Sequence, residues 1–301
     1  MADAYFRVKH EAVATLTSCG PGLANLVMAL AVAQTDSSAL LAITANVPTS
    51  QFNRGPFQEI NRHNQADFPN TIRPVVKHSY RPSRVEMLPL ALCQAATTML
   101  SGRPGPVNID IPFNLFQEEA NVEIEPPSGS HNFRRSGAAP DDVSIAVDKM
   151  LAAERPVLFI GHGVNLSETA EELTALAHRL RIPVISSPNG KGFILMDDDL
   201  SLSFIGRNGV YPANQAGRRA DLVIAIGARF DDRSASSWLP GYSWNFPHTE
   251  LIHVDVEHAE IGRNYWLTLG ILSDTWTFLR QVLAELDGRE TMLERRTTAW
   301  L

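Results

Sequence analysis

Short runs of apolar residues recur along the chain, and each has the length of a buried strand. In the first part of the chain one run begins at Val13 and ends before Gly20, and two others cover residues 39–45 and 106–112. The run 39–45 is continuous, which is typical of a strand covered on both faces, as in a parallel sheet. Residues 23–34 and 83–100, between the runs, have the composition and spacing of helices. This alternation of strand and helix favours an α/β fold with parallel strands.

A Gly-Pro-Gly turn separates the first strand from the helix that follows it. Gly20 and Gly22 let the backbone fold tightly and leave no side chain over the start of the helix. The free N–H groups there, together with the positive end of the helix dipole, suit a ligand above the sheet. By itself the tripeptide more often marks a plain turn, so the case for a ligand site depends on the surrounding residues.

Two further patterns concern helix ends. Ser83 and Glu86 have the spacing of a capping box, which predicts the start of the helix that ends at about Leu100, before Gly102. The opening residues 1–7 resemble the last turns of a helix already under way, because no capping residue precedes them.

The second half of the chain repeats the alternation after a change in composition. Residues 117–140 are rich in acidic residues, proline and serine and poor in apolar residues, as in an interdomain linker. We expect two doubly wound parallel-sheet domains of the α/β class, the second Rossmann-like, with ligands at the carboxyl ends of the strands. The predicted division is a first domain (1–118), a linker (119–140), a second domain (141–290) and a tail (291–301). In the second domain, strands are predicted at 156–160, 183–186, 221–226, 251–256 and 266–271, and helices at 142–152, 167–180, 211–218 and 274–286.

Composition excludes several classes of function. The net charge of -7 over 301 residues argues against a nucleic acid or an anionic membrane as the main partner. No apolar run is long enough to span a bilayer, and no signal peptide is evident. Cys19 and Cys93 are too few for a disulfide framework and are expected to be buried thiols in a reducing cytoplasm. The nine histidines show no metal-binding spacing.

The chain offers several candidate sites from the residues alone. Gln58, beside an acidic residue, lies in a long polar loop, 46–73, and loops of that length are usually functional or disordered. Gly161 and Gly163 follow a strand as a partial dinucleotide-binding loop, or equally as a tight strand-to-helix turn. Asp255, after a later strand, could accept a ribose hydroxyl or cap a turn.

One loop of the second domain is rich in charges. Arg229 could bind a pyrophosphate, with Asp231 orienting it. A solvated, salt-bridged loop explains the same residues equally well.

Four motifs, in order, establish a family resemblance. They are Thr17–Asn25, the tripeptide Phe57-Gln58-Glu59, Ser101–Val107 and Gly227–Arg233. The combination strongly resembles the acetolactate synthase family, whose members are thiamine-diphosphate-dependent enzymes with pyrimidine-binding, central and diphosphate-binding domains in that order. The resemblance covers essentially all of the chain.

The resemblance implies a pyrimidine-binding domain at 1–118 and a central domain at 141–290. It implies part of a 2-oxo acid decarboxylase or carboligase that uses thiamine diphosphate and Mg²⁺, with FAD in the synthases, and that forms a homodimer or homotetramer in the cytoplasm. The aminopyrimidine contacts of the family correspond to Pro21, Asn25 and Gln58. The flavin contacts correspond to Arg103, Gly161, Gly163, Ser187, Gly206, Gly227, Arg229, Asp231, Asp255 and Asp274.

The chain departs from the family pattern at its ends. The family's activating glutamate lies just before a segment that residues 1–7 resemble, so we expect it to precede Met1. We expect the diphosphate domain, with its metal motif, to follow Leu301. No catalytic or metal-binding residue is therefore assigned within the chain, and the isolated chain is expected to be inactive.

Other departures leave two alternatives open. The family's Met-His-Gly is replaced by Arg207-Asn208-Gly209, and Pro188 stands where leucine is usual, which weakens the case for flavin. The loop 60–68 is longer than in typical synthases, which leaves a related carboligase or decarboxylase as a candidate. The alternatives to an enzyme are a non-catalytic nucleotide-binding or regulatory module and a truncated gene product without function.

Overall fold

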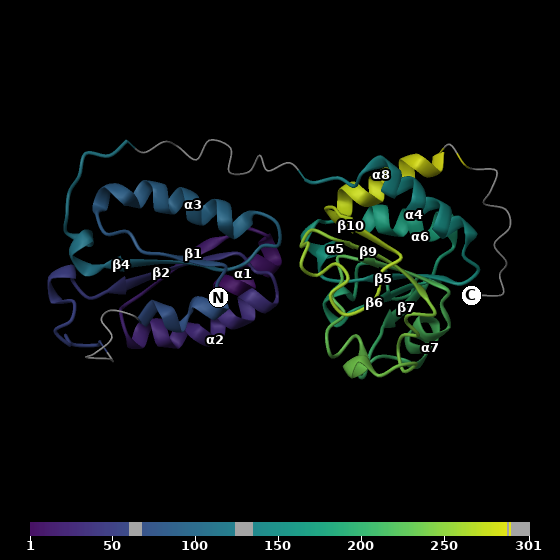
Figure 1. The fold of residues 1–301 in the computed structure, drawn as a ribbon, viewed down its shortest axis with the longest axis horizontal. Coiled ribbons are helices and arrows are strands. Elements are labelled where there is room, and N and C mark those ends of the chain that lie inside the picture. Colours follow the sequence, from purple (N-terminus) through teal and green to yellow (C-terminus); the bar gives the residue numbers. More distant parts are fainter. Residues whose placement is uncertain (60–67, 124–134, 288, 290–301) are drawn as a thin grey trace. The chain divides into compact units, whose positions relative to one another are not determined.

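The structure is a computed structural model that describes residues 1–59, 68–123, 135–287 and 289. The chain divides into two compact units, Met1–Phe133 and Arg134–Leu301 (Figure 1), which are described separately. This division lies within the predicted linker. Most of the predicted longer loop, 60–68, and the whole predicted tail, 291–301, lie outside the described residues.

The first unit is built on a four-stranded parallel sheet with strand order β1-β2-β4-β3. In Figure 1, helix α2 lies on one face of this sheet and α3 on the other. Leu23 and Leu30 of α2 pack with Leu40 and Ala42 of β2 in the core. The elements are α1 (Ala2–Lys9), β1 (Val13–Thr17), α2 (Pro21–Thr35), β2 (Leu40–Asn46), β3 (His78–Tyr80), α3 (Leu88–Leu100) and β4 (Val107–Pro112).

The start of α3 differs from its prediction. Ser83 donates a hydrogen bond to the sulfur of Met87 at 3.6 Å, and the predicted capping box does not form. A short 3-10 turn, Val85–Met87, comes first, and the α-helix begins only at Leu88. Pro89 lies in the first turn of the helix, where its fixed φ and missing N–H are tolerated. The proline therefore sets the start of the helix.

The prediction that both cysteines are buried was wrong. Cys19 is half-buried, and Cys93 is exposed. Helix α3 buries Ala91, Ala95 and Met99, which recur every four residues on one face. Cys93 lies on the opposite face of the helix and so points away from the sheet.

The second unit contains a six-stranded parallel sheet with strand order β10-β9-β8-β5-β6-β7. Along β5, Leu158 and Ile160 belong to one buried cluster, and Val157 and Phe159 belong to another. Helices α4, α6 and α8 contribute to the first cluster, and α7 to the second. The sheet is thus covered on both faces. The elements are α4 (Pro140–Ala152), β5 (Pro156–Ile160), α5 (Gly163–Leu166), α6 (Ala170–Leu180), β6 (Val184–Ser186), β7 (Ser201–Phe204), α7 (Tyr211–Arg219), β8 (Leu222–Ile226), β9 (Glu250–Asp255), β10 (Leu269–Leu272) and α8 (Thr275–Asp287).

These two sheets confirm the predicted fold class, α/β with parallel strands throughout. The differences from the predictions lie at edges and ends. Strands β3 and β7 were not predicted, β10 begins three residues later than expected, and the helix predicted from residue 167 begins at Ala170. Glu168, with a φ of 56°, interrupts the backbone between α5 and α6. No helix among the described residues is both long and apolar enough to cross a bilayer.

Aromatic side chains fill the second cluster. Phe159 is fully buried, and its ring centroid lies 5.2 Å from that of Phe230 and 4.9 Å from that of Trp244. His253 of β9 is also buried against the Phe230 ring. Its Nε2 lies 2.9 Å from the carbonyl oxygen of Ala228 and donates to it.

Replacing Phe159 by alanine should lower the free energy of unfolding of the second unit by about 3–5 kcal/mol, because a large buried side chain leaves a cavity. Leu195→Ala is the control, since 72% of that side chain is exposed, and it should change stability by less than about 0.5 kcal/mol. All five tryptophans lie at or after Trp238. Urea unfolding followed by tryptophan fluorescence therefore measures this unit, and equal effects of the two substitutions would contradict the prediction.

Candidate functional site

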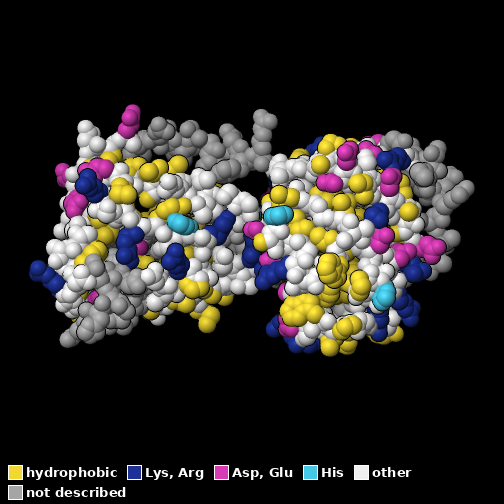
Figure 2. All heavy atoms as spheres, viewed as in Figure 1, with side chains coloured by type: hydrophobic (Ala, Val, Ile, Leu, Met, Phe, Trp, Pro, Cys, Tyr) yellow, Lys and Arg dark blue, Asp and Glu magenta, His cyan; other side chains and the backbone are white. Residues whose placement is uncertain are grey.

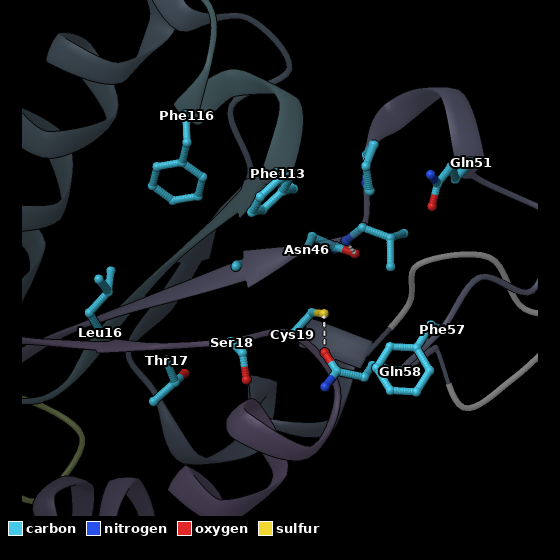
Figure 3. A pocket seen from close by; sticks show the side chains of 13 residues that line it. Leu16, Thr17, Ser18, Cys19, Asn46, Gln51, Phe57, Gln58, Phe113 and Phe116 are labelled. Carbon is cyan, nitrogen blue, oxygen red and sulfur yellow. Dashed lines mark hydrogen bonds between the residues drawn. The ribbon is translucent and has the colours of Figure 1, made fainter.

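A cavity of about 510 Å³ lies at the carboxyl ends of β1, β2 and β4 in the first unit (Figure 3). Most of its lining is apolar, with a few polar side chains, as in sites for small organic ligands. Phe57 is 88% exposed, and Phe113 and Phe116 are half exposed. The residues that line the cavity are Leu16, Thr17, Ser18, Cys19, Ala45, Asn46, Val47, Pro48, Gln51, Phe57, Gln58, Phe113 and Phe116.

Gly20 permits the loop to pack against the start of α2. Its φ is +51°, a conformation that L side chains rarely adopt. A Cβ atom at this position would lie only 2.0 Å from the carbonyl oxygen of Gln58. The glycine is therefore required both by its own backbone and by the close approach of the loop at residues 55–58.

Gln58 is the polar side chain that this packing brings to the cavity. The thiol of Cys19 donates to its Oε1 at 3.2 Å (Figure 3). Within the described residues its amide nitrogen has no hydrogen-bond partner, so two N–H donors can serve a ligand. Burial raises the pKa of the Cys19 thiol. The uncharged thiol therefore serves as a donor that orients the Gln58 amide.

A second group of glycines lies at the carboxyl edge of the sheet in the second unit. A Cβ on Gly161 would lie 2.1 Å from the carbonyl oxygen of Gly227, and one on Gly163 would lie 2.7 Å from the Cα of Gly227. The N–H of Gly163 donates to the Gly227 carbonyl at 3.0 Å. These three glycines are thus needed where the ends of β5 and β8 meet.

Two family descriptions match this chain. "Thiamine pyrophosphate enzyme, N-terminal TPP binding domain" matches residues 1–67, and "Thiamine pyrophosphate enzyme, central domain" matches residues 143–282. The chain belongs to the thiamine pyrophosphate enzyme family. The first unit (Met1–Phe133), with the cavity, thus contains the N-terminal TPP binding domain, and the second unit (Arg134–Leu301) contains the central domain; each unit is named below after the domain that it contains.

Curated relatives agree with this membership. The probable acetolactate synthase large subunit of Methanocaldococcus jannaschii is 34% identical over 98% of this chain and 50% of the relative. The acetolactate synthase large subunit of Parasynechococcus marenigrum is 36% identical over 100% of this chain and 47% of the relative. These matches confirm the predicted resemblance. The chain spans about half the length of the curated relatives it matches.

A solved structure shows the same fold. The crystal structure of benzoylformate decarboxylase from Polynucleobacter necessarius matches with a TM-score of 0.78 and 22% identity. The match covers 94% of this chain and 51% of that protein.

Of the three predicted pyrimidine contacts, only Gln58 lines the cavity. Pro21 and Asn25 are exposed on the first turns of α2, beside Gly20. Sequence reasoning missed Asn46 and Phe113 as lining residues. Each stands at or directly after the carboxyl end of a strand, which is the signal that could have identified them.

Several residues that were predicted to contact flavin form hydrogen bonds within the central domain. Asp231 accepts hydrogen bonds from the Ser234 N–H at 2.8 Å and from its hydroxyl at 2.9 Å. Asp255 accepts from the Glu257 N–H at 2.8 Å, as in the capped turn that we considered. The carboxylate of Asp274 accepts a bond from the Ser167 hydroxyl at 2.7 Å. These carboxylates therefore have structural partners already.

Three other predicted flavin positions lie near the sheet edge of the central domain. Ser187 directly follows β6 and is buried. Gly206 has a φ of +114°, and a Cβ there would lie 2.0 Å from the Arg233 carbonyl oxygen. Arg229 lies two residues after Gly227, in a loop whose Asp232 forms an exposed ion pair at 2.7 Å with Arg207, from the segment after β7. The ion pair fits the interpretation of a solvated, salt-bridged loop.

Arg103 belongs to the TPP binding domain and contacts the end of α2. Its guanidinium donates to the hydroxyl of Ser37 at 2.8 Å and to the carbonyl oxygens of Gln34 at 2.6 Å and Thr35 at 3.0 Å. A cation at this position also suits the negative end of the helix dipole.

In the described part of the chain, no group of three acidic, histidine or cysteine side chains could bind a metal ion.

Gly20→Ala should destabilise the TPP binding domain more than Gly102→Ala does. Both positions have a positive φ, so each alanine costs about 1–2 kcal/mol of backbone strain. Only Gly20 has an atom within contact distance, since nothing lies within 4 Å of a Cβ at Gly102. Urea unfolding followed by far-ultraviolet circular dichroism should show the larger loss for Gly20→Ala. Equal losses would mean that the Gln58 loop is not packed as described.

Proposed function

We propose that the chain is part of a thiamine-diphosphate-dependent enzyme that decarboxylates a small 2-oxo acid and resembles acetolactate synthase in its chemistry. The observation that supports this most strongly is the cavity in the TPP binding domain, where Gly20 brings the Gln58 amide to the carboxyl edge of the sheet. Similarity over the whole chain to acetolactate synthase subunits supports the substrate class.

The donor set of the cavity fits an aminopyrimidine ring. The apolar walls suit a flat ring, and the Gln58 amide can donate to a ring nitrogen. We propose Gln58, Pro21 and Asn25 as the contacts on the pyrimidine side, the latter two at the start of α2. When bound, thiamine diphosphate supplies the electron sink that loss of carbon dioxide from a 2-oxo acid requires. The residues of the chain contribute orientation and an apolar environment.

Other features of the whole protein are proposed from the resemblance. They are Mg²⁺ as the ion that accompanies the diphosphate, a homodimer or homotetramer, and a cytoplasmic location. FAD is a weaker proposal, because Asp231, Asp255, Asp274 and Arg103 already have partners within the fold. The non-catalytic nucleotide-binding module is not favoured, because the matches include the TPP binding domain.

A chimeric enzyme tests the activity directly. In the acetolactate synthase large subunit of Parasynechococcus marenigrum, residues 1–301 of this chain would replace the segment that aligns with them. The chimera should form acetolactate from pyruvate, and Gln58→Ala should lower kcat/KM by about tenfold or more, the value of one lost hydrogen bond. A folded chimera that binds thiamine diphosphate but decarboxylates no 2-oxo acid would contradict the proposal.

Binding of the pyrimidine can be tested in the chain itself. Saturation-transfer NMR with thiamine diphosphate should give stronger signals from the pyrimidine protons than from the thiazolium protons. Gln58→Ala should weaken these signals by about threefold or more, and Gln94→Ala, on the exposed side of α3, should not. Equal transfer to both rings, or no effect of Gln58→Ala, would contradict the assignment of the pyrimidine ring to this cavity.

Flavin binding has its own test. If FAD binds the central domain, its fluorescence should be quenched by the chain, and Arg229→Ala should weaken binding by about 10- to 100-fold through loss of a charge-assisted contact. Arg155→Ala is the matched control. Arg155 is not one of the predicted flavin contacts, and its guanidinium donates a hydrogen bond to the carbonyl oxygen of Arg219. Absence of quenching at tens of micromolar (roughly) protein would show that the flavin residues do not form a site in this chain.

A further inference from the structure

A buried carboxylate of the TPP binding domain adjoins the cavity. The side chain of Asp110, on β4, is 1% exposed. It accepts hydrogen bonds from the Thr44 hydroxyl at 2.9 Å and from the amide of Asn46 at 2.5 Å. Arg81 donates to the same carboxylate at 3.1 Å, and 38% of the arginine side chain is exposed. Nothing in the sequence pattern or the proposed pyrimidine contacts accounts for this group.

Asp110 is part of a polar row, buried except at its half-buried end, Ser79; we define the row as Ser79, Asn108, Thr44, Asp110 and Asn46. The amide of Asn108 donates to the hydroxyl of Thr44 at 3.0 Å and accepts a bond from Ser79 at 2.7 Å. The row therefore runs from β3 across β4 to the end of β2. On the same face of the sheet, the neighbouring positions are filled by apolar residues such as Leu40 and Ala42.

Stability alone is a weak reason for this arrangement. Removing a carboxylate from water costs free energy that its partners offset only in part, and an apolar substitute of the same volume is often as stable. What distinguishes the row is where it ends. Asn46 is the last residue of β2 and lines the cavity.

Hydrogen bonds hold both the nitrogen and the oxygen of the Asn46 carboxamide. Its nitrogen donates to Asp110, and its oxygen accepts the N–H of Val47 at 2.8 Å. Val47 and Pro48 form part of the cavity wall. A carboxylate can accept from several donors at once and has no donor of its own to repel the Asn46 amide. An asparagine at position 110 could not accept all three bonds.

We propose that Asp110 is a positioning residue for the cavity. Its carboxylate orients the Asn46 carboxamide and thereby keeps the wall at Val47 and Pro48 in one conformation. The link to the cofactor rests on the proposed function of the cavity, but the positioning itself does not.

The Cys19 thiol provides a probe of the cavity that needs no cofactor. It lines the cavity, and Cys93→Ser makes it the only thiol of the chain. The rate of its reaction with iodoacetamide, an uncharged reagent, reports how accessible this part of the cavity wall is under native conditions. The charged groups that act on this thiol are Glu59 and Asp110, and Arg81 faces Asp110.

In this background, Asp110→Asn and Asn46→Ala should each raise the alkylation rate about fivefold, the value of one hydrogen bond. At equal thiolate fraction, the double variant should be little faster than either single variant, because both act on accessibility through one contact. Ser79→Ala, at the far end of the row, is the matched control and should leave the rate within about twofold. If Asp110→Asn does not fold, Asn46→Ala carries the test.

The pH dependence of alkylation separates charge from position. Asp110→Asn removes a negative charge and should lower the apparent pKa of the Cys19 thiol, whereas Asn46→Ala keeps the charge and should not. Unchanged rates in both variants, with lower stability, would show a structural role only and overturn the proposal. An equal rise in Ser79→Ala would also overturn it. Faster alkylation without saturation transfer to thiamine diphosphate would retain the positioning role and reject the cofactor assignment.

Discussion

Every strand pair in both sheets is parallel, and this constraint determines where chemistry can occur. Parallel strands bring all their carboxyl ends to one edge, so the loops that follow them meet there. In the TPP binding domain, the cavity lies at the ends of β1, β2 and β4. In the central domain, the ends of β5 and β8 approach so closely that only Gly161, Gly163 and Gly227 fit between them.

The pattern of apolar runs predicted the buried strands well, because a strand covered on both faces is apolar throughout. β5, which is buried along its whole length, has the predicted bounds. Two of the edge strands, β3 and β7, were missed for the complementary reason. β3 has the sequence His-Ser-Tyr and pairs only with β4, so its side chains need not be apolar. The start of α3 was also wrong, because a proline outweighed the capping box.

The site was predictable only where a local motif marks it. Gln58 stands in a motif of the family resemblance, and the structure places it at the cavity. Asp110 lies in a strand whose other residues are apolar, apart from Asn108. Thr44 lies opposite Asp110 only because of the register between β2 and β4. Register between distant strands is a tertiary property that one sequence does not reveal. The same holds for Asp231 and Asp274, whose partners appear only in the fold.

The burial of His253 limits the conditions under which the central domain is stable. Burial lowers the pKa of this imidazole, because the charged form would lose its hydration, and the bond to the Ala228 carbonyl and the charge of Glu260 oppose this only in part. The neutral ring is therefore retained in the fold, whereas the unfolded chain takes up a proton near pH 6.5. Below that pH the unfolded state binds more protons than the folded one, so stability falls with acidity until the folded ring also titrates. The burial of one imidazole is thus expected to make the central domain less stable in mild acid than at neutral pH.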